Sequence, residues 1–336
     1  MLKTPFFWHS KSFASRITSY FFLPIAAIYY LAYLANACFK HFFIKKTKLP
    51  IKTILVGNYT MGGAGKTPFC IALANFYLSR GKRVCFLSKG YGRKLCGFYE
   101  VNSAKNLNLD PFLYGDEPVL LSKTAPVFLY SKASDLKKPS YQNFDIAIMD
   151  DGLHGGLIKP NQTIILWDGA LNYTNKFPFP AGGFRCLLSN PFIKADMHFA
   201  ILPQGMQKPL NQSFFAKIPS FYTAKTSVAF KNDASLQSLQ NSKVIAFCGI
   251  ARPQKFYQSL ELLGIKPVKT ISFADHHSYT KQEVLRLLNY KKDGFALITT
   301  AKDIVKIEHL IGNQHGFNVL QISTLFDFGL FYDKTF

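Results

Sequence analysis

The sequence predicts an α/β protein with a mostly parallel sheet, a second, smaller α/β unit and an N-terminal membrane helix. Three observations lead to this prediction. Short apolar runs, typical of buried parallel strands, alternate with helical stretches. A glycine-rich turn follows the first of these runs, and residues 17–39 contain no charged side chain. We therefore expect a membrane anchor with basic flanks at residues 1–48, a phosphate-binding domain at 49–225 and a smaller C-terminal α/β domain at 226–336.

Residues 17–39 are long enough to cross the hydrocarbon core of a bilayer as one helix. Basic residues flank this segment, more densely on its C-terminal side: Lys3, Lys11 and Arg16 precede it, and Lys40, Lys45, Lys46 and Lys48 follow it. The denser flank predicts that the rest of the chain faces the cytoplasm. A signal peptide is disfavoured because the apolar run is long and lacks a clear cleavage site. A buried core helix is the other alternative, and Pro24 and Asn36 leave open whether the helix spans the membrane or lies in its interface.

The next segment predicts a phosphate-binding loop. An apolar run at 54–57 leads into a turn and then a helix, with the sequence Thr60, Met61, Gly62, Gly63, Ala64, Gly65, Lys66, Thr67. Glycines let backbone N–H groups surround phosphate oxygens, Lys66 can reach the β- and γ-phosphates, and the hydroxyl of Thr67 can ligate Mg²⁺. The usual P-loop pattern has Gly at the first position, where this chain has Thr60. We expect a P-loop NTPase-type fold.

Further elements follow in alternation. The loop helix is expected at 66–80, with Gly81 ending it. Strands are expected at 84–88, 127–130, 146–149, 163–167 and 199–202. A polar region at 203–232 separates these from a second set, with strands at 244–248, 268–273 and 296–300 and helices at 254–263 and 281–290. Ligands of such sheets bind beyond the carboxyl ends of the strands.

Acidic residues stand at several of these strand ends. Asp150 and Asp151 close the run at 146–149, where phosphate-loop enzymes place a carboxylate that holds Mg²⁺ directly or through water. A helix-capping role is the alternative for such residues. Asp116 lies in a Gly-Asp-Glu-Pro stretch that by itself often only starts a helix. His276 and His277 follow Asp275, and adjacent histidines rarely bind one metal, so a histidine paired with a carboxylate of the other unit fits better.

Composition restricts the class of partner and of compartment. The 336 residues are 48% hydrophobic, which suits a folded chain, and their formal net charge is +21. This charge favours an anionic partner: nucleic acid, an anionic membrane surface or a phosphorylated substrate. The six cysteines form no Cys-x-x-Cys pair, which disfavours a zinc site or a disulfide framework and suits a reducing compartment.

Several motifs in order resemble one family, the tetraacyldisaccharide 4'-kinases, which are the lipid A 4'-kinases of Gram-negative bacteria. The resemblance covers nearly the full length and includes the N-terminal hydrophobic helix. Its motifs are Gly57-Asn58, Gly62-Gly63-Ala64-Gly65-Lys66-Thr67-Pro68, Ser88-Lys89-Gly90-Tyr91-Gly92-Arg93, Gly115-Asp116-Glu117-Pro118, Asp150-Asp151-Gly152, Pro180-Ala181-Gly182 with Arg185, Gly249-Ile250-Ala251-Arg252-Pro253, Asp275-His276-His277 and Thr300-Ala301-Lys302-Asp303. Thr60 in place of the first glycine is also typical of the family.

The resemblance implies an ATP-dependent kinase at the cytoplasmic face of the inner membrane. Its acceptor would be the 4'-hydroxyl of an acylated glucosamine disaccharide 1-phosphate, and an anionic membrane surface would be its second partner. Asp116 would be the general base, with His276 or, as second choice, His277 as its partner. Lys66 would act on the phosphates, and Asp150 and Asp151 would position Mg²⁺ with Thr67.

Two departures from the family's pattern stand out. The family usually has Asp-Asp-Gly-x-Gln-His, but His154 occupies the Gln position here and Gly155 follows it. The Arg-Asp pair expected soon after is replaced by Lys159-Pro160-Asn161.

The main alternative function is a membrane-associated ATPase or GTPase switch. Against a GTPase, the stretch Thr300-Ala301-Lys302-Asp303 lacks the Asn of a guanine-binding motif. A nucleic-acid-binding ATPase is disfavoured by the hydrophobic segment and by the lack of a recognisable basic and aromatic module. We therefore expect no nucleic-acid partner.

Overall fold

The computed structural model describes residues 5–10, 12–106, 109–138, 141–173, 175–230, 236–312 and 316–331. Its strands are β1 (Lys52–Gly57), β2 (Val84–Ser88), β3 (Tyr99–Val101), β4 (Val127–Leu129), β5 (Ile146–Asp150), β6 (Gln162–Asp168), β7 (Met197–Leu202), β8 (Phe221–Phe230), β9 (Val244–Cys248), β10 (Lys269–Ser272), β11 (Ala296–Thr300) and β12 (Asn318–Leu325). Its α-helices are α1 (Phe13–Phe21), α2 (Leu23–Phe43), α3 (Lys66–Leu78), α4 (Pro111–Tyr114), α5 (Asp116–Ser122), α6 (Gln212–Phe215), α7 (Leu236–Gln240), α8 (Pro253–Leu262), α9 (Lys281–Lys292) and α10 (Ala301–Ile311).

In the described part of the chain, twelve strands form one sheet in the order β10-β9-β11-β12-β8-β7-β6-β1-β5-β2-β4-β3. All neighbours pair in parallel except β3 with β4 and β12 with β8. The predicted α/β fold with a mostly parallel sheet is confirmed. The strands β2, β9 and β11 have the bounds that the sequence predicted, because each is a short, mostly apolar and mostly buried run.

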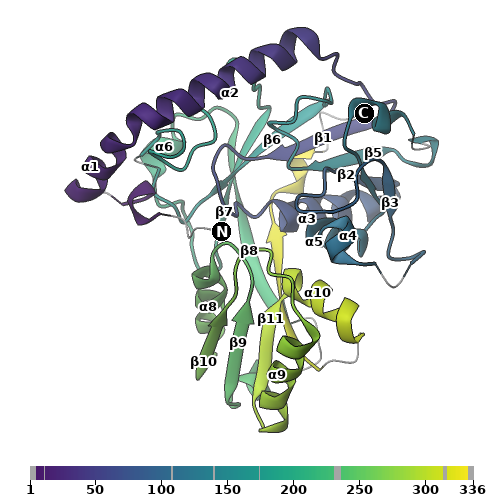
Figure 1. Ribbon diagram of the computed structural model, residues 1–336, viewed down its shortest axis with the longest axis vertical. Coiled ribbons are helices and arrows are strands. Elements are labelled where there is room, and N and C mark those ends of the chain that lie inside the picture. The colour runs from purple at the N-terminus through teal and green to yellow at the C-terminus, as the bar shows by residue number, and fades with distance from the viewer. Residues whose placement is uncertain are drawn as a thin grey trace.

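The prediction that residues 203–232 are only a polar connection is wrong. Strand β8 lies there and carries the sheet from one half of the molecule into the other (Figure 1). Its first half pairs in parallel with β7, from Phe221 opposite His198, and its second half pairs antiparallel with β12, to Phe230 opposite Leu320. Few of its side chains are buried, so the strand lacks the apolar run by which buried strands are found. The division of the chain at residues 225 and 226 stays a prediction.

The single helix predicted at 17–39 is two helices. Helix α1 ends at Phe21, and α2 begins at Leu23. Pro24 lies in the first turn of α2, where its missing N–H leaves no hydrogen bond unmade but prevents α1 from continuing. In Figure 1, α2 lies along the outside of the body of the protein and does not project away from it.

The core around α3 also contains the end of the described chain. Phe69 of α3 is fully buried and stacks on Phe326, with ring centroids 4.6 Å apart. Phe76 stacks on Phe328 at 4.7 Å. The segment after β12 therefore returns to pack on the helix that carries the phosphate loop.

We predict that Phe326→Ala lowers the free energy of unfolding by about 3–5 kcal/mol, the usual cost of removing a buried phenylalanine ring. Urea unfolding of the detergent-solubilised full chain measures this loss. Leu325→Ala is the matched control, because the adjacent Leu325 is 57% exposed. Equal effects of the two variants would contradict the packing of the chain end on α3.

Candidate active site

The phosphate loop is shaped by its glycines and by a neighbouring segment. Gly62 and Gly65 have φ angles of +93° and +79°, a region that side chains with a Cβ rarely adopt. Gly65 is the N-cap of α3. The backbone N–H of Met61 donates to the Gly183 carbonyl at 2.7 Å, and the N–H of Arg185 donates to the Tyr59 carbonyl at 2.7 Å. The Pro180–Arg185 motif therefore acts as a short partner strand that fixes the first half of the loop.

The structure brings the predicted loop residues and the predicted metal ligands together. The Thr67 hydroxyl donates to Oδ2 of Asp150 at 3.1 Å. The Lys66 ammonium lies 3.4 Å from Oδ2 of Asp151 and donates to Oδ1 of Asn58 at 3.2 Å. Arg185 lies 3.4 Å from the same Asp151 carboxylate. Asp150 thus faces Thr67, whereas Asp151 lies between two cations.

Asp150 is suited to hold a cation. Its side chain is buried, and its Oδ1 atom has no hydrogen-bond partner. Burial, together with the negative charge of Glu117, raises the pKa of this carboxyl well above its ordinary value. A divalent cation between Thr67 and Asp150 would satisfy the unpaired oxygen and offset both effects. No group of three or more His, Cys, Asp or Glu side chains around a common point occurs in the described residues, so such a cation would also need ligands from the nucleotide or water.

Asp116 and His276 meet although 160 residues separate them. Asp116 is the first residue of α5, and His276 lies in the loop after β10. Nδ1 of His276 lies 3.0 Å from Oδ2 and 3.1 Å from Oδ1 of the Asp116 carboxylate. Two lysines of α10, Lys302 and Lys306, place their ammonium groups 4.0 and 3.9 Å from the same carboxylate.

These contacts set the charge states of the pair. Burial acts to raise the pKa of Asp116, but the hydrogen bond to His276 and the charge of Lys302 outweigh it and hold the pKa below its ordinary value. The hydrogen bond to Asp116 raises the pKa of His276, against the effects of burial and of Lys302. Asp116 is therefore a carboxylate at neutral pH, the form that can accept a proton.

His277 points elsewhere. Its Nε2 atom lies 3.2 Å from the Glu283 carboxylate, which also completes the capping box of α9 with Thr280. The structure thus places His276, the first choice from the sequence, next to Asp116. His276 has a φ of +57°, an uncommon value for a side chain with a Cβ, and its N–H donates to the Gly249 carbonyl at 3.2 Å.

Three positively charged neighbours of the site were not singled out from the sequence as site residues. The Lys302 ammonium also donates to Glu117 at 2.8 Å and lies 3.4 Å from Nε2 of His276. Lys302 and Lys306 have a spacing of four residues, which places both on one face of the helix that follows β11. That spacing after a strand end was the available signal. Arg252 is the third, and its Nη2 atom would lie 3.3 Å from a Cβ placed on Gly62.

Asp168, at the carboxyl end of β6, was also missed. Only 2% of its surface is exposed, and its Oδ2 atom accepts hydrogen bonds from Arg252, at 2.6 Å, and from Lys255. This pairing holds Arg252 of the C-terminal half over the phosphate loop. A polar residue at the end of a parallel strand was the signal that could have identified Asp168.

Comparison with known proteins identifies the architecture. The family model described as tetraacyldisaccharide-1-P 4'-kinase matches residues 18–330. The chain belongs to this family. A tetraacyldisaccharide 4'-kinase of Rhodopseudomonas palustris is 31% identical over 91% of this chain and 86% of its own length. A relative with the same name from Nitrobacter winogradskyi is 28% identical over 92% of this chain and 88% of its own length. Another from a Methylobacterium species is 33% identical over 77% of this chain and 76% of its own length.

A solved structure of a tetraacyldisaccharide 4'-kinase family member agrees with the fold. The Aquifex aeolicus protein LpxK, crystallised in complex with ATP, superposes with a TM-score of 0.69 at 26% identity, covering 92% of this chain and 95% of that one. The predicted membership of the tetraacyldisaccharide 4'-kinases is therefore confirmed. With it, the prediction of a kinase of lipid A biosynthesis is confirmed as well.

We predict a pH-dependent contribution of His276 to stability. The pKa of His276 is raised in the folded state, so its proton stabilises the fold. This stabilisation is complete at a pH below the unfolded-state pKa of about 6.5 and is lost as the pH rises through the folded-state pKa. The free energy of unfolding of the wild type minus that of His276→Gln should therefore be largest below the unfolded-state pKa and shrink as the pH rises through the folded-state pKa. Asp116 stays ionised at the lower pH because its own pKa is lowered.

Thermal and urea unfolding across this pH range measure the difference. The exposed His41 supplies the control, since His41→Gln should have little effect at any of these pH values. A difference for His276→Gln that does not change with pH would show that the ion pair with Asp116 contributes nothing to stability.

Proposed function

We propose that this kinase transfers the γ-phosphoryl group of ATP to the 4'-hydroxyl of a tetraacyldisaccharide 1-phosphate, with Asp116 as general base. One observation carries this assignment: a carboxylate held ionised by His276 lies on a helix next to the phosphate loop. Helix α5 packs against α3, and Glu117 is near enough to Asp150 to raise its pKa. The base and the phosphate site therefore adjoin.

The chain's own residues account for the binding of the triphosphate. Backbone N–H groups of residues 60–67 and the N-terminus of α3 surround the phosphates. Lys66 exchanges its contact with Asp151 for the β- and γ-phosphates. Charge spread over the phosphoryl oxygens in the transition state is neutralised mainly by such fixed groups.

Mg²⁺ fits the same site. Thr67 and Asp150 would hold the ion, because the unpaired Oδ1 of Asp150 and the Thr67 hydroxyl provide oxygen ligands side by side, and Asp151 would reach it through water. The bound ion would neutralise charge on the β- and γ-phosphates.

Asp116 would take the proton of the acceptor hydroxyl as the new O–P bond forms. His276 orients this carboxylate through its Nδ1–H, and the Lys302 ammonium near Nε2 favours the tautomer that carries its proton on Nδ1. General base assistance of this kind is worth about 10²–10⁴ in rate.

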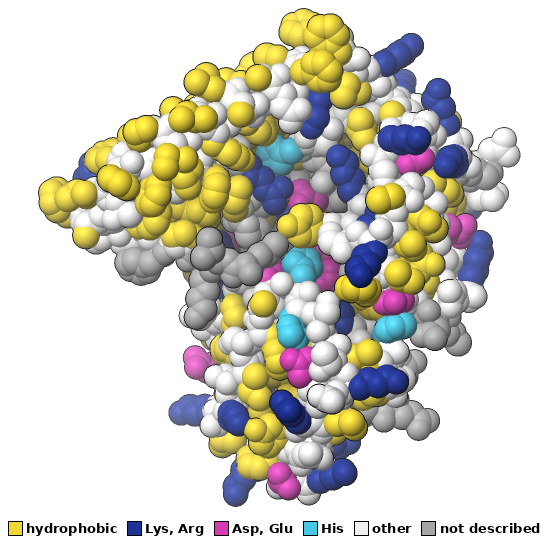
Figure 2. Space-filling model, viewed as in Figure 1, with side chains coloured by type: hydrophobic (Ala, Val, Ile, Leu, Met, Phe, Trp, Pro, Cys, Tyr) yellow, Lys and Arg dark blue, Asp and Glu magenta, His cyan; other side chains and the backbone are white. Residues whose placement is uncertain are grey.

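The first two helices supply a membrane-binding face. Figure 2 shows hydrophobic side chains gathered along α1 and α2. The most exposed of them are Phe13, Phe21, Ile28, Leu31, Phe42 and Phe43, each at least 65% exposed. Helix α2 is long and apolar enough to cross a membrane, but its other face packs on the body of the protein through Ala26, Tyr29 and Tyr33. We therefore place α2 along the interface of the inner membrane, with the active site on the cytoplasmic side.

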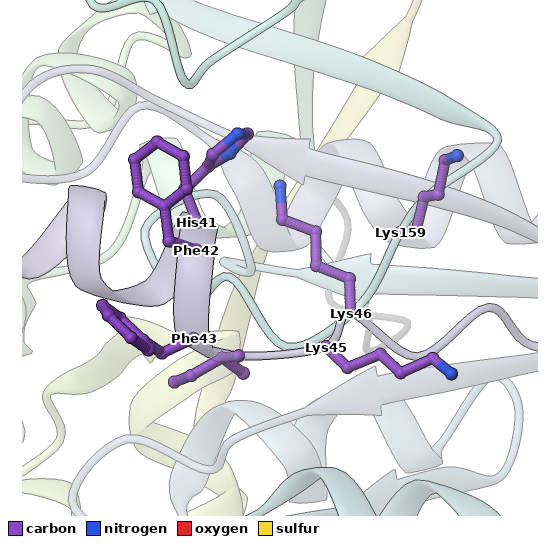
Figure 3. Close-up of a pocket in the computed structure, with 7 residues that line it drawn as sticks. His41, Phe42, Phe43, Lys45, Lys46 and Lys159 are labelled. Atoms are coloured by element: carbon purple, nitrogen blue, oxygen red, sulfur yellow. The ribbon is translucent and has the colours of Figure 1, made fainter.

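A basic hollow continues this face at the end of α2. It encloses about 560 Å³ and is lined by His41, Phe42, Phe43, Ile44, Lys45, Lys46 and Lys159. Figure 3 shows the two aromatic rings and the lysines of residues 45 and 46 coming from α2 and the segment after it, with Lys159 beside them. Exposed rings next to lysines suit an anionic lipid surface, where rings enter the headgroup layer and lysines pair with phosphates.

We predict that Asp116→Asn lowers the rate of phosphate transfer by about 10²–10⁴-fold while ATP binding stays near that of the wild type. Transfer of labelled γ-phosphate onto a purified disaccharide 1-phosphate lipid in detergent micelles measures the rate. Asp110→Asn is the matched control, because Asp110 also faces a histidine, His309 at 3.6 Å, but caps α4 and does not contact His276. Near-normal transfer by Asp116→Asn would remove Asp116 from the base role.

The same assay distinguishes the kinase from a nucleotide switch. A switch hydrolyses ATP or GTP at full rate without the lipid, whereas the kinase requires the acceptor for turnover. Hydrolysis that the acceptor does not change, with no label in the lipid, would favour the switch.

We predict that Lys45→Gln with Lys46→Gln weakens binding to anionic vesicles about 30-fold, since each lysine near such a surface contributes about 1 kcal/mol. Co-sedimentation with vesicles of mixed phosphatidylglycerol and phosphatidylcholine measures binding, with phosphatidylcholine alone as the uncharged comparison. The pair Lys281→Gln with Lys292→Gln on α9, at the opposite end of the molecule from α2 (Figure 1), should bind like the wild type. Equal losses in both pairs would indicate a general charge effect.

A further inference from the structure

His154 has no part in the chemistry proposed above, yet it lies between the membrane-facing helix and the phosphate loop. It occupies the loop that follows β5 and Asp151. Both nitrogen atoms of its ring have partners. Nδ1 lies 3.0 Å from the hydroxyl of Tyr33 on α2, and Nε2 lies 3.2 Å from the backbone carbonyl of Asn58 at the end of β1.

These partners fix the direction of each hydrogen bond. A carbonyl oxygen can only accept, so Nε2 carries the proton and donates it to Asn58. Nδ1 then accepts from the Tyr33 hydroxyl, whose oxygen accepts in turn from the amide of Asn190 at 3.1 Å. Burial and the charge of Arg185 lower the pKa of His154 to about 4, so the ring stays in this neutral form near pH 7.

Asn58 links His154 to the phosphate loop. It is fully buried, its Oδ1 accepts from the Lys66 ammonium at 3.2 Å, and its Nδ2 donates to the Thr60 carbonyl at 2.7 Å. One residue thus holds both the first position of the loop and its lysine. The chain Tyr33–His154–Asn58–Lys66 is continuous, with every link within hydrogen-bond distance.

Helix α2 makes two further hydrogen bonds, one to the His154 loop and one to the segment that carries Arg185. The Lys40 ammonium donates to the His154 carbonyl at 3.3 Å, and the Tyr29 hydroxyl donates to the Arg185 carbonyl at 3.3 Å. Tyr29, Tyr33 and Lys40 share one face of the helix by their spacing of four and seven residues. The loop also has no room to move toward β1, since a Cβ on Gly57 would lie 2.7 Å from Cβ of Leu153.

We propose that His154 is a positioning residue that ties the placement of Lys66 to the docking of α2 on the body of the protein. Helix α2 is then a part of the nucleotide site as well as a membrane-binding element. Its inner face sets the phosphate loop through Tyr33 and His154, while its outer face meets lipid. The inference rests on the proposed phosphate transfer for its effect on rate, but the predicted effect on ATP affinity stands without the acceptor.

The test compares four full-length variants: His154→Ala, His154→Gln, Tyr33→Phe and the combination of His154→Ala with Tyr33→Phe. Losing a hydrogen bond next to Asn58 should weaken ATP binding about 3- to 10-fold in His154→Ala. Tyr33→Phe should also weaken ATP binding, but by less than His154→Ala does. His154→Gln should restore wild-type affinity, because an amide can accept from Tyr33 and donate to Asn58. Binding of a fluorescent ATP analogue measures affinity, and single-turnover transfer onto the disaccharide lipid measures the chemical step.

The double variant tests whether Tyr33 acts on Lys66 through His154, which we call the relay, or whether the two side chains act independently. If Tyr33 acts through His154, the double variant loses no more ATP affinity than His154→Ala alone. The double variant and His154→Ala then both have a lower kcat, with little change in the KM of the lipid. Tyr30→Phe is the matched control, since its ring stacks on Tyr33 one turn away without joining the relay, and it should behave like the wild type.

Three results would overturn the inference: additive losses in the double variant, a His154→Gln protein as impaired as His154→Ala, or wild-type ATP affinity in all variants. Absence of phosphate transfer by the wild type would instead reject the proposed function, and the affinities would still decide the relay. Lowered melting temperature with unchanged affinity and kcat would assign His154 a role in stability only.

Discussion

The in-register parallel pairing of β1 with β5 is the constraint on which the rest of the site depends. It sets Val56 opposite Asp150, so the phosphate loop that follows Gly57 and the two carboxylates at 150 and 151 leave the sheet at the same edge. Strand ends in a parallel sheet are aligned by backbone hydrogen bonds. The register of β1 and β5 is therefore enough to bring Thr67 within hydrogen-bond distance of Asp150. The helices α3 and α5 are then positioned by packing on this part of the sheet.

The electrostatics of the site differ from those of the protein as a whole. The chain carries a net charge of +21, yet the centre of the molecule collects buried carboxylates, among them Asp116, Asp150, Asp168 and Asp303. Lysine or arginine side chains from another part of the chain face three of them: Lys302 at Asp116, Lys66 near the Asp150–Asp151 turn, and Arg252 at Asp168. Removing one member of such a buried pair leaves an uncompensated charge. The pairings of Lys302 with Asp116 and of Arg252 with Asp168 also join the two halves of the sheet.

The two faces of helix α2 have different surroundings. Its outer face exposes large apolar side chains, and its inner face hydrogen-bonds to loops that surround the phosphate site. A surface helix that only anchored the chain would need no such polar contacts. Their presence joins the exposed apolar residues of α2 and the residues around the phosphate loop in a single structural unit, which suits a reaction whose acceptor is a lipid.

The sequence by itself determined those features that depend on a few neighbouring residues. Glycines at 62 and 65 before Lys66 and Thr67 specify a phosphate loop, and apolar runs that end in Asp specify strands with polar ends, because backbone conformation and side-chain period are local properties. The strand β8 was missed because few of its side chains are buried and it has no continuous apolar run, and one helix was expected where Pro24 separates two. Only the tertiary structure decided which histidine faces Asp116, which lysines neutralise it and what α2 contacts. These pairings join residues more than a hundred positions apart in the chain or depend on how helices pack, and no local pattern encodes a distance of that kind.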